Sequence, residues 1–354
     1  MALDLLTLEE GGVNYGIESL KIMIYGGNTL GKTPQSMRFP KPLLFMGEAG
    51  GGAIKGRKVT ISSKKDFVDY VKQLTNDKTL DKMKEIYQTI ILDTATDIVD
   101  LYKAAVAADY QKNDVSQVKP SKAEPDLPNG YALYRDSFKR DINLLCSKGY
   151  TVIFIMHEEL AEIKETSVGT DKNGNVKVMS NGTEQFKYMP KGSSNEKDSA
   201  RFLRDLCDFR FYIKGNGIDE DGNVIPSTAY CHETSEFYAG SRFDIQNVVN
   251  PFTAENLIEA MTEAQKRSAE NYGANLVSFE LKDDNYTKAD YIRDITPIAT
   301  ALVQGGYGEE YQKIVVGQLK TTARISEAKE TQLRELDSIY TQAEELARAY
   351  HLEY

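Results

Sequence analysis

Several residue types are scarce or missing in this chain of 354 residues, and each absence excludes a class of protein. There is no Trp, so 21 Tyr and 13 Phe must supply the large side chains of the core. The three cysteines, Cys146, Cys207 and Cys231, are odd in number and lack metal-binding spacing, which argues against a disulfide framework. A reducing, cytoplasmic environment fits this cysteine usage best.

Long apolar runs and basic stretches are also missing. No run of 18 apolar residues exists, so the sequence predicts no membrane span. The first residues, Met-Ala-Leu-Asp-Leu-Leu, lack a basic region, and we do not expect a signal peptide. The net charge is −10, of which residues 251–354 contribute −7 through 11 basic and 18 acidic side chains. A broad basic face for nucleic acid is therefore not expected on this tail.

Short apolar runs alternate with amphipathic segments through the first 250 residues. The runs predict strands at residues 22–25, 43–46, 58–61, 86–92 and 151–156. The last run is almost wholly apolar, as in a sheet that is buried on both faces. Strands that alternate with helices indicate an α/β domain with a mostly parallel central sheet.

The pattern changes behind the last of these strands. Residues 162–200 are polar, and the turn signals Asn173-Gly174 and Asn181-Gly182 separate segments that suit hairpin arms. Further along the chain, apolar residues recur at helical spacing, which predicts helices. We therefore expect a core of residues 1–250 and a small helical C-terminal region of residues 251–354.

A glycine-rich segment directly after the first apolar run organises the chain. Gly26, Gly31, Lys32 and Thr33 fit the pattern G-x-x-x-x-G-K-[ST] of the phosphate-binding P-loop. Lys32 is expected to reach the β- and γ-phosphates of ATP, and the Thr33 hydroxyl to bind Mg²⁺. The residues expected to surround the nucleotide are Gly26, Gly27, Asn28, Thr29, Leu30, Gly31, Lys32 and Thr33. The alternative is a chance glycine-rich turn, which the preceding strand disfavours.

Three polar residues follow other predicted strands. Asp93 follows residues 86–92 and suits a Walker B ligand of Mg²⁺, or else a helix N-cap. Glu48 follows residues 43–46 and suits the acid that orients the attacking water, or else a solvated loop residue. His157 ends the strand at 151–156 and suits a γ-phosphate contact, or else a structural histidine. Open α/β sheets bind ligands at this edge, which favours the functional roles.

The order of these motifs resembles the RecA/KaiC-type ATPases, most closely the phage-encoded RecA-like ATP-binding proteins associated with single-strand annealing and recombination. The matching stretches lie at residues 24–33, 44–48, 89–93 and 152–158, and the resemblance covers residues 18–250. It implies a RecA-like P-loop NTPase core, Mg²⁺-dependent ATP hydrolysis and assembly into a homo-oligomeric ring or filament.

The resemblance also implies two loops that face single-stranded DNA, at residues 111–130 and 160–200. Phe186 and Tyr188 would stack on unpaired bases. The lysines that would neutralise phosphates are Lys112, Lys119, Lys122, Lys164, Lys172, Lys177, Lys187 and Lys191. Acidic residues are interleaved with them, so a solvated hairpin is the alternative.

A late basic residue would reach the ATP of a neighbouring subunit in such an assembly. Ala239-Gly-Ser-Arg242-Phe243 resembles the Arg-Phe part of the corresponding motif in RadA-type proteins, which implies an arginine finger at Arg242. The lysine that usually precedes this pair is missing, and a surface salt bridge is the alternative role.

Three functions compete on the sequence alone. The leading one is an ATPase acting on single-stranded DNA in phage-type recombination, annealing or replication. The second is a P-loop ATP switch or partner-loading protein without direct action on DNA. A small-molecule kinase is disfavoured because no arginine-rich lid segment is evident. The acidic helical region after residue 250 suits a lid, an oligomerisation element or a docking site for a protein partner.

Overall fold

The computed structural model describes residues 11–47, 54–120, 129–170, 176–192, 201–280, 288–320, 324–329, 332–350 and 352. Within these ranges only the backbone is described for residues 163–170, 176–185, 290 and 334. The chain forms two compact units, Met1–Leu281 and Lys282–Tyr354.

A ten-stranded sheet lies at the centre of the first unit, in the order β11-β9-β8-β2-β6-β5-β3-β4, with β10 paired to β8 and β7 to β6. Its strands are β2 (Lys21–Gly26), β3 (Pro42–Met46), β4 (Arg57–Thr60), β5 (Thr89–Asp93), β6 (Thr151–Thr170), β7 (Val176–Pro190), β8 (Phe209–Lys214), β9 (Thr228–Tyr230), β10 (Gly240–Ser241) and β11 (Val248–Val249). The pairs that join β4, β3, β5, β6, β2 and β8 are all parallel. The largely parallel sheet that the apolar runs predicted is therefore present in these six strands.

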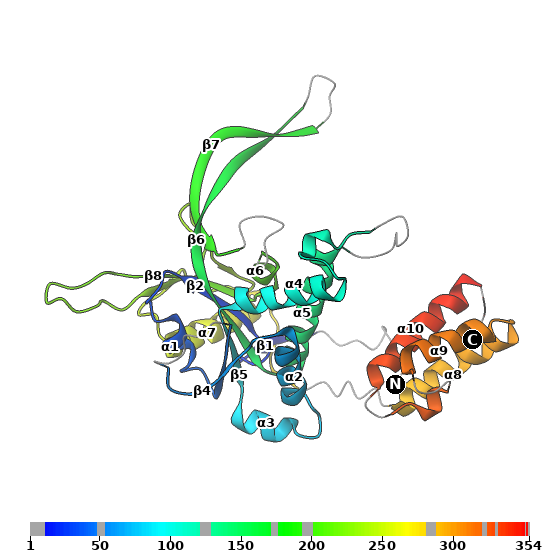
Figure 1. Ribbon diagram of the computed structural model, residues 1–354. Helices are drawn as coiled ribbons and strands as arrows, with labels where there is room; N and C mark the ends of the chain where they lie inside the picture. Colours follow the sequence, from blue (N-terminus) through cyan, green and yellow to red (C-terminus); the bar gives the residue numbers. More distant parts are fainter. Residues whose placement is uncertain are drawn as a thin grey trace. The chain divides into compact units, whose positions relative to one another are not determined.

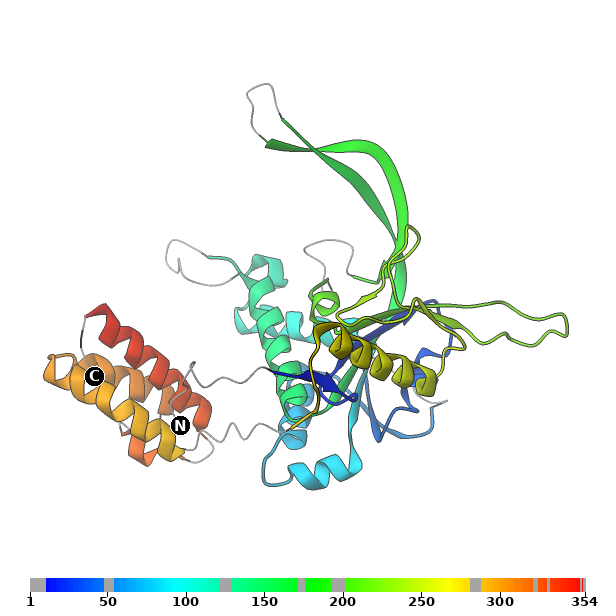
Figure 2. The ribbon, with the colours of Figure 1, turned by 180° about the vertical axis from the view of Figure 1, so that it is seen from behind.

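Helices cover both faces of the sheet, as Figures 1 and 2 show. The helices of this unit are α1 (Lys32–Ser36), α2 (Lys64–Leu74), α3 (Leu80–Ile86), α4 (Ala95–Asp109), α5 (Gly130–Ser147), α6 (Arg201–Leu206) and α7 (Ala254–Tyr272). One face of the sheet packs against α2, α4, α5 and α6 through Met23, Tyr25, Phe45, Leu92 and Phe154. The opposite face packs against α7 through Ile22, Ile24, Ile91, Ile153 and Phe211. Because apolar side chains cover both faces of the sheet, polar and apolar residues do not alternate along these strands.

The starts of α2 and α7 follow the rules of N-capping. Ser63 precedes α2, and its hydroxyl accepts a hydrogen bond from the N–H of Asp66. Thr253 precedes α7 in the same way and accepts from the N–H of Asn256.

The structure corrects two details of the predicted elements. Residue Ile86 belongs to the end of α3, so the strand predicted at 86–92 begins only at Thr89. The N-terminal residues contain β1 (Val13–Tyr15), which pairs in parallel with β12 (Leu276–Ser278). Because β1 and β12 are more than 260 residues apart in sequence, no local sequence pattern predicts that they pair.

The strand β6 leaves the sheet and forms a long hairpin with β7, which rises from the carboxyl edge in Figure 1. The turn signal Asn173-Gly174 lies at residues 171–175, outside the described residues. The second predicted turn, Asn181-Gly182, is wrong, because β7 continues through it. Lys164 on β6 pairs with Glu184 on β7, and Thr166 pairs with Ser180. The single residue between Lys164 and Thr166 is therefore opposite three residues, 181–183, and this segment of β7 is a bulge.

The second unit consists of α8 (Lys288–Gln304), α9 (Gly308–Leu319) and α10 (Leu333–Ala349). Its core contains Ile295, Val315, Leu319, Leu336 and Ile339. The expected boundary at residue 250 precedes the division at 281, because α7 packs on the central sheet with Leu257 and Met261. No helix among the described residues is long and apolar enough to cross a membrane.

Candidate nucleotide-binding site

The glycine-rich segment connects β2 to α1 at the carboxyl edge of the sheet. Gly26 ends β2 with φ 152°, and a Cβ at this position would lie 2.3 Å from the carbonyl oxygen of Ile213 in the neighbouring strand β8. Only glycine fits so close to a second backbone. Gly31 has φ 84° directly before α1, again a conformation that favours glycine. The two glycines of the motif are thus required by backbone geometry.

The side chain of Lys32 places a buried positive charge beside this loop. Its Nζ donates hydrogen bonds to the carbonyl oxygens of Gly26 at 2.9 Å and Gly27 at 2.6 Å. Burial lowers the pKa of Lys32, and the charges of Asp93 and Glu158 act in the opposite direction. A phosphate is a stronger acceptor than a carbonyl because its hydrogen bond to an ammonium group is charge-assisted. The ammonium group is therefore available to an anion held by the loop.

Thr33 and Asp93 meet across the site. The Thr33 hydroxyl in α1 donates to Oδ2 of Asp93 at the end of β5, with 2.5 Å between the oxygens. Hydroxyl and carboxylate oxygens are ligands that Mg²⁺ accepts, with phosphate and water oxygens completing its octahedron. No group of three or more His, Cys, Asp or Glu suited to a metal occurs in the described part of the chain. The two oxygens thus fit a magnesium ion to which the nucleotide itself contributes ligands.

His157 lies at the same edge of the sheet, in register with Gly26. It lines a cavity of about 520 Å³ beside the P-loop. The lining residues are Gly26, Gly27, Asn28, His157, Glu158, Glu159 and Lys191. The strand-end position thus brings His157 to the crevice that the sequence indicated, and its contact with a γ-phosphate stays a prediction.

Glu158 and Glu159 also line this cavity, although the sequence pattern suggested only local partners or solvated charges. Oε1 of Glu158 lies 3.2 Å from the position that a Cβ on Gly27 would occupy. Oε2 of Glu158 and Oε1 of Glu159 are buried and have no hydrogen-bond partner among the described residues. Three consecutive polar residues after a strand do not reveal which of them faces the crevice. The available signal was their position directly after a strand that ends at the ligand-binding edge of the sheet.

The other two predicted catalytic residues have different outcomes, since only Arg242 lies among the described residues. Glu48 lies in residues 48–53, outside the described residues, two positions after Met46, which is in register with Asp93. Arg242 lies at the amino edge of the sheet, where it donates to Oδ1 of Asp208 at 3.1 Å and to the carbonyl oxygen of Asp205 at 3.0 Å. Arg242 therefore does not serve the P-loop of its own chain, and a role toward a neighbouring subunit stays a prediction.

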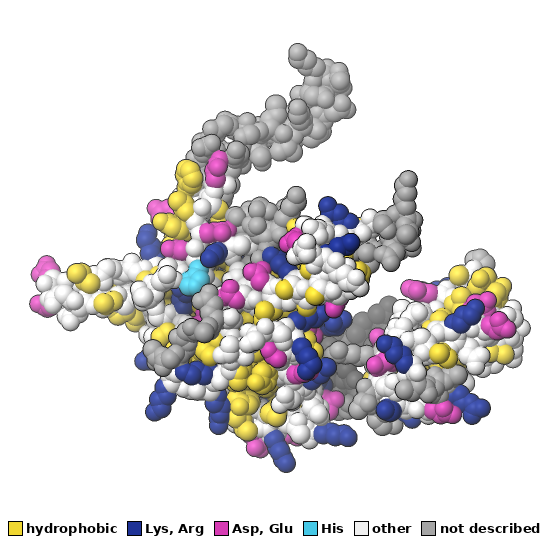
Figure 3. Space-filling model, viewed as in Figure 1, with side chains coloured by type: hydrophobic (Ala, Val, Ile, Leu, Met, Phe, Trp, Pro, Cys, Tyr) yellow, Lys and Arg dark blue, Asp and Glu magenta, His cyan; other side chains and the backbone are white. Residues whose placement is uncertain are grey.

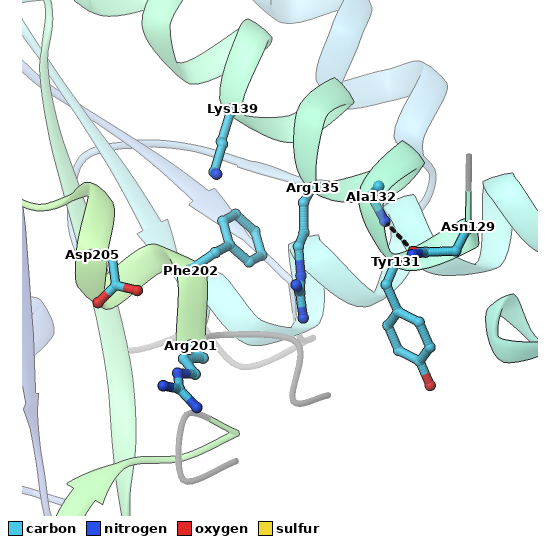
Figure 4. A pocket seen from close by; sticks show the side chains of 8 residues that line it. All are labelled: Asn129, Tyr131, Ala132, Arg135, Lys139, Arg201, Phe202 and Asp205. Carbon is cyan, nitrogen blue, oxygen red and sulfur yellow. Dashed lines mark hydrogen bonds between the residues drawn. The ribbon is translucent and has the colours of Figure 1, made fainter. Parts of the chain in front are cut away.

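A second pocket, of about 540 Å³, lies between the first half of α5 and α6 (Figure 4). Three cationic side chains line it, Arg135 and Lys139 from α5 and Arg201 from α6. Figure 4 shows Lys139 extending from α5 toward Phe202 on α6, with Arg135 beside that ring, and the Lys139 Nζ is 5.8 Å from the ring centre. The other lining residues are Asn129, Tyr131, Ala132 and Asp205. The pocket combines positive charge with aromatic surface.

The side chains expected to contact DNA have different environments. Lys122 and Lys172 lie outside the described residues, as do the side chains of Lys164 and Lys177. Lys112, Lys119 and Lys191 are exposed. Lys187 is wrong as a phosphate contact, because it is buried and forms an ion pair with Glu233.

Apolar side chains gather at the base of the hairpin (Figure 3). The exposed fractions are 57% for Leu160, 57% for Phe186 and 39% for Tyr188. These three side chains share one face, because Leu160 is in register with Tyr188 and Phe186 lies two positions before Tyr188 on β7. Phe186 is accordingly free to meet a flat ligand.

The α/β fold, the P-loop at the carboxyl edge and the paired Thr33 and Asp93 define a P-loop nucleotide-binding protein. A family described as AAA domain (AAA_24) matches residues 18–243, more than half of the chain. The chain is also 34% identical over 344 residues to the SPbeta prophage-derived uncharacterized protein YorG of Bacillus subtilis (strain 168), and this match covers 94% of the chain and 95% of that protein. The chain therefore belongs to this AAA-domain family of P-loop ATPases.

Proposed function

We propose that the protein is a RecA-like, Mg²⁺-dependent ATPase that assembles into a homo-oligomer and acts on single-stranded DNA in phage-type recombination, annealing or replication. The observation that carries the DNA part is the cationic pocket between α5 and α6. Both loops expected to face DNA end at this pocket. Asn129 closes the loop at residues 111–130, and Arg201 directly follows residues 160–200.

The pocket has the chemistry of a single-strand site. Positive side chains at Arg135, Lys139 and Arg201 would neutralise successive phosphates. The half-exposed ring of Tyr131 beside them offers a face for a base, whereas Phe202 is buried and forms the floor. Because the chain as a whole is acidic, DNA binding must be local, and this pocket brings three basic side chains together.

The hydrolytic part of the proposal uses the residues at the P-loop edge. Lys32 would bind the β- and γ-phosphates, and Thr33 and Asp93 would hold Mg²⁺, which stabilises the negative charge on the phosphates. Glu48 would orient the attacking water, and His157 would donate a hydrogen bond to the γ-phosphate. Arg242 would complete the site of a neighbouring subunit in the oligomer.

Oligonucleotide binding tests the DNA part. We expect the wild-type protein to bind a single-stranded oligonucleotide more tightly with a non-hydrolysable ATP analogue than with ADP. On single strands, affinity falls with salt at a log–log slope of about −0.7 per neutralised phosphate. Replacing Arg135, Lys139 and Arg201 together with Ala should therefore flatten the slope by about 2 and leave ATP binding intact.

A matched control removes three positive charges elsewhere. Lys65, Lys72 and Lys78 are exposed on and after α2, and their joint replacement with Ala should leave the slope unchanged. Equal flattening in both triple variants would mean that only the overall charge matters. A wild-type protein that binds ATP and shows no salt-sensitive oligonucleotide binding would favour the alternative function, an ATP switch or partner-loading protein that does not act on DNA.

A further inference from the structure

A short chain of hydrogen bonds fixes the residue that follows Asp93. Thr94 is buried and directly precedes α4. Its hydroxyl donates a hydrogen bond to Oδ2 of Asp97, three residues further along the chain. Since a hydroxyl has only one hydrogen to donate, the Thr96 hydroxyl, 3.1 Å away, is the donor in its bond with Thr94. The side chain of Thr94 is therefore held from two sides, next to the carboxylate that suits Mg²⁺.

The contact between Thr94 and Asp97 differs from an ordinary helix cap. The hydroxyl of a threonine at the N-cap normally accepts a hydrogen bond from the N–H of the second or third helical residue. The Thr94 side chain makes no such bond to the backbone of α4 and donates to the Asp97 carboxylate instead. Capping of α4 therefore does not account for the bond between these two side chains.

Asp97 also contacts the end of the neighbouring strand. Gly47 directly follows β3, and a Cβ on Gly47 would lie 2.7 Å from Cβ of Asp97 and 3.2 Å from the carbonyl oxygen of Thr94. The N–H of Gly47 donates to the carbonyl oxygen of Asp93 at 2.8 Å. No larger residue fits at position 47 without displacing one of these groups. The ends of β3 and β5 thus meet against Asp97.

We propose that Asp97 is a positioning residue for Mg²⁺, because through Thr94 it holds Asp93 in the orientation that brings its carboxylate to Thr33. This inference rests on the proposed function, since it requires Mg²⁺ and ATP at the P-loop. The side chain of Asp93 is fixed by the Thr33 hydroxyl, and its backbone is fixed by Gly47 and by the anchored Thr94. Loss of a group that orients a metal ligand typically weakens metal binding 10–100-fold.

Calorimetric titration of the whole protein with a non-hydrolysable ATP analogue, once with Mg²⁺ and once with EDTA, tests this inference. The ratio of the two affinities measures how strongly Mg²⁺ supports nucleotide binding. Asp97→Ala removes the acceptor of the Thr94 hydroxyl, so the ratio should fall about tenfold. The affinity in EDTA should stay at the wild-type value, because the P-loop loses no contact with phosphate. Asp97→Asn keeps an oxygen that accepts from Thr94 and should retain the wild-type ratio.

Two further variants complete the test. Thr94→Val has a similar shape and lacks the donor, so it should lower the ratio as Asp97→Ala does, and it carries the test if Asp97→Ala does not fold. Asp100→Ala removes an exposed acid from the same helix and should leave the ratio unchanged. Wild-type ratios in both Asp97→Ala and Thr94→Val overturn the inference. A ratio in Asp97→Asn as low as in Asp97→Ala also overturns it, because the charge of Asp97 and not its hydrogen bond would then matter.

The wild type separates this inference from the proposed function. A wild-type protein that binds the analogue equally well with Mg²⁺ and with EDTA overturns the role of Asp97 and leaves nucleotide binding at the P-loop intact. A wild-type protein that binds the analogue in neither condition overturns the proposed function itself.

Discussion

Replacement of Lys32 with Ala is the sharpest test of the P-loop. In the wild type, Mg·ATP at about 100 times its Kd should stabilise the folded state by about 2.7 kcal/mol. The first unit has 281 residues, and unfolding entropies near 2.1 cal/mol/K per residue convert this gain into a rise in Tm of about 4–5 °C. Scanning calorimetry resolves a shift of this size.

The variant should lose almost all of this shift. Nζ of Lys32 is buried against Gly26 and Gly27, and a charge-assisted hydrogen bond from such a group is worth about 1.5–3 kcal/mol. If about 2.7 kcal/mol is lost, the same nucleotide concentration only matches the new Kd, and about 0.4 kcal/mol of stabilisation remains. That corresponds to less than about 1 °C. The control Lys65→Ala, at a side chain that is 84% exposed, should keep the full shift.

Equal shifts in Lys32→Ala and the wild type would refute the assignment of residues 26–33 as the nucleotide site. Chelation of Mg²⁺ with EDTA offers an internal check on the same samples. It should reduce the wild-type shift, because Thr33 and Asp93 then lack the ion that joins them to the phosphates.

Further outcomes are expected for variants at Arg242, Glu48 and Tyr102. Arg242→Ala should fold normally, because its guanidinium is half-exposed, such an ion pair is worth about 0–1 kcal/mol, and Asp208 keeps the hydrogen bond that it accepts from the N–H of Lys21. Arg242→Ala and Glu48→Gln should each hydrolyse little ATP when tested alone. A mixture of the two variants should recover turnover, since a mixed interface joins an intact Glu48 to an intact Arg242. A co-assembled mixture that stays inactive would contradict a shared site. Tyr102→Phe should cost about 1–3 kcal/mol in urea unfolding at pH 7, because the buried Asp141 carboxylate loses its donor. Burial and the Asp141 charge raise the pKa of Tyr102 in the folded state, so the stability that Tyr102 contributes is complete below pH 10, the ordinary tyrosine value, and is lost at higher pH. Above pH 10 the free energy of unfolding should therefore fall more steeply with pH in the wild type than in Tyr102→Phe. Parallel curves of unfolding free energy against pH would contradict this.

The central sheet was predictable because its strands are buried on both faces. Runs such as residues 22–25 and 151–156 are apolar at nearly every position, and burial against helices on each side requires that pattern. Helix α3 was missed for the opposite reason. Leu80 is its only buried residue, so the segment carries no helical stripe.

The site was predictable where local geometry dictates residue type. Glycine at position 26 follows from the approach of Ile213, and Lys32 and Thr33 follow from phosphate and metal chemistry. The location of Arg242 was not predictable, since the turn that brings it to Asp208 depends on the pairing of β10 with β8. Lys187 was misjudged because its partner Glu233 lies 46 residues away in sequence.

The hairpin β6–β7 shows that a change in composition along the chain does not always mark the end of a strand. Residues 152–156 are apolar and hydrogen-bonded to β2 and β5, whereas residues 158–170 are mostly polar and paired with β7, yet both belong to one continuous strand. The change in composition marks a change of partner and not the end of the element.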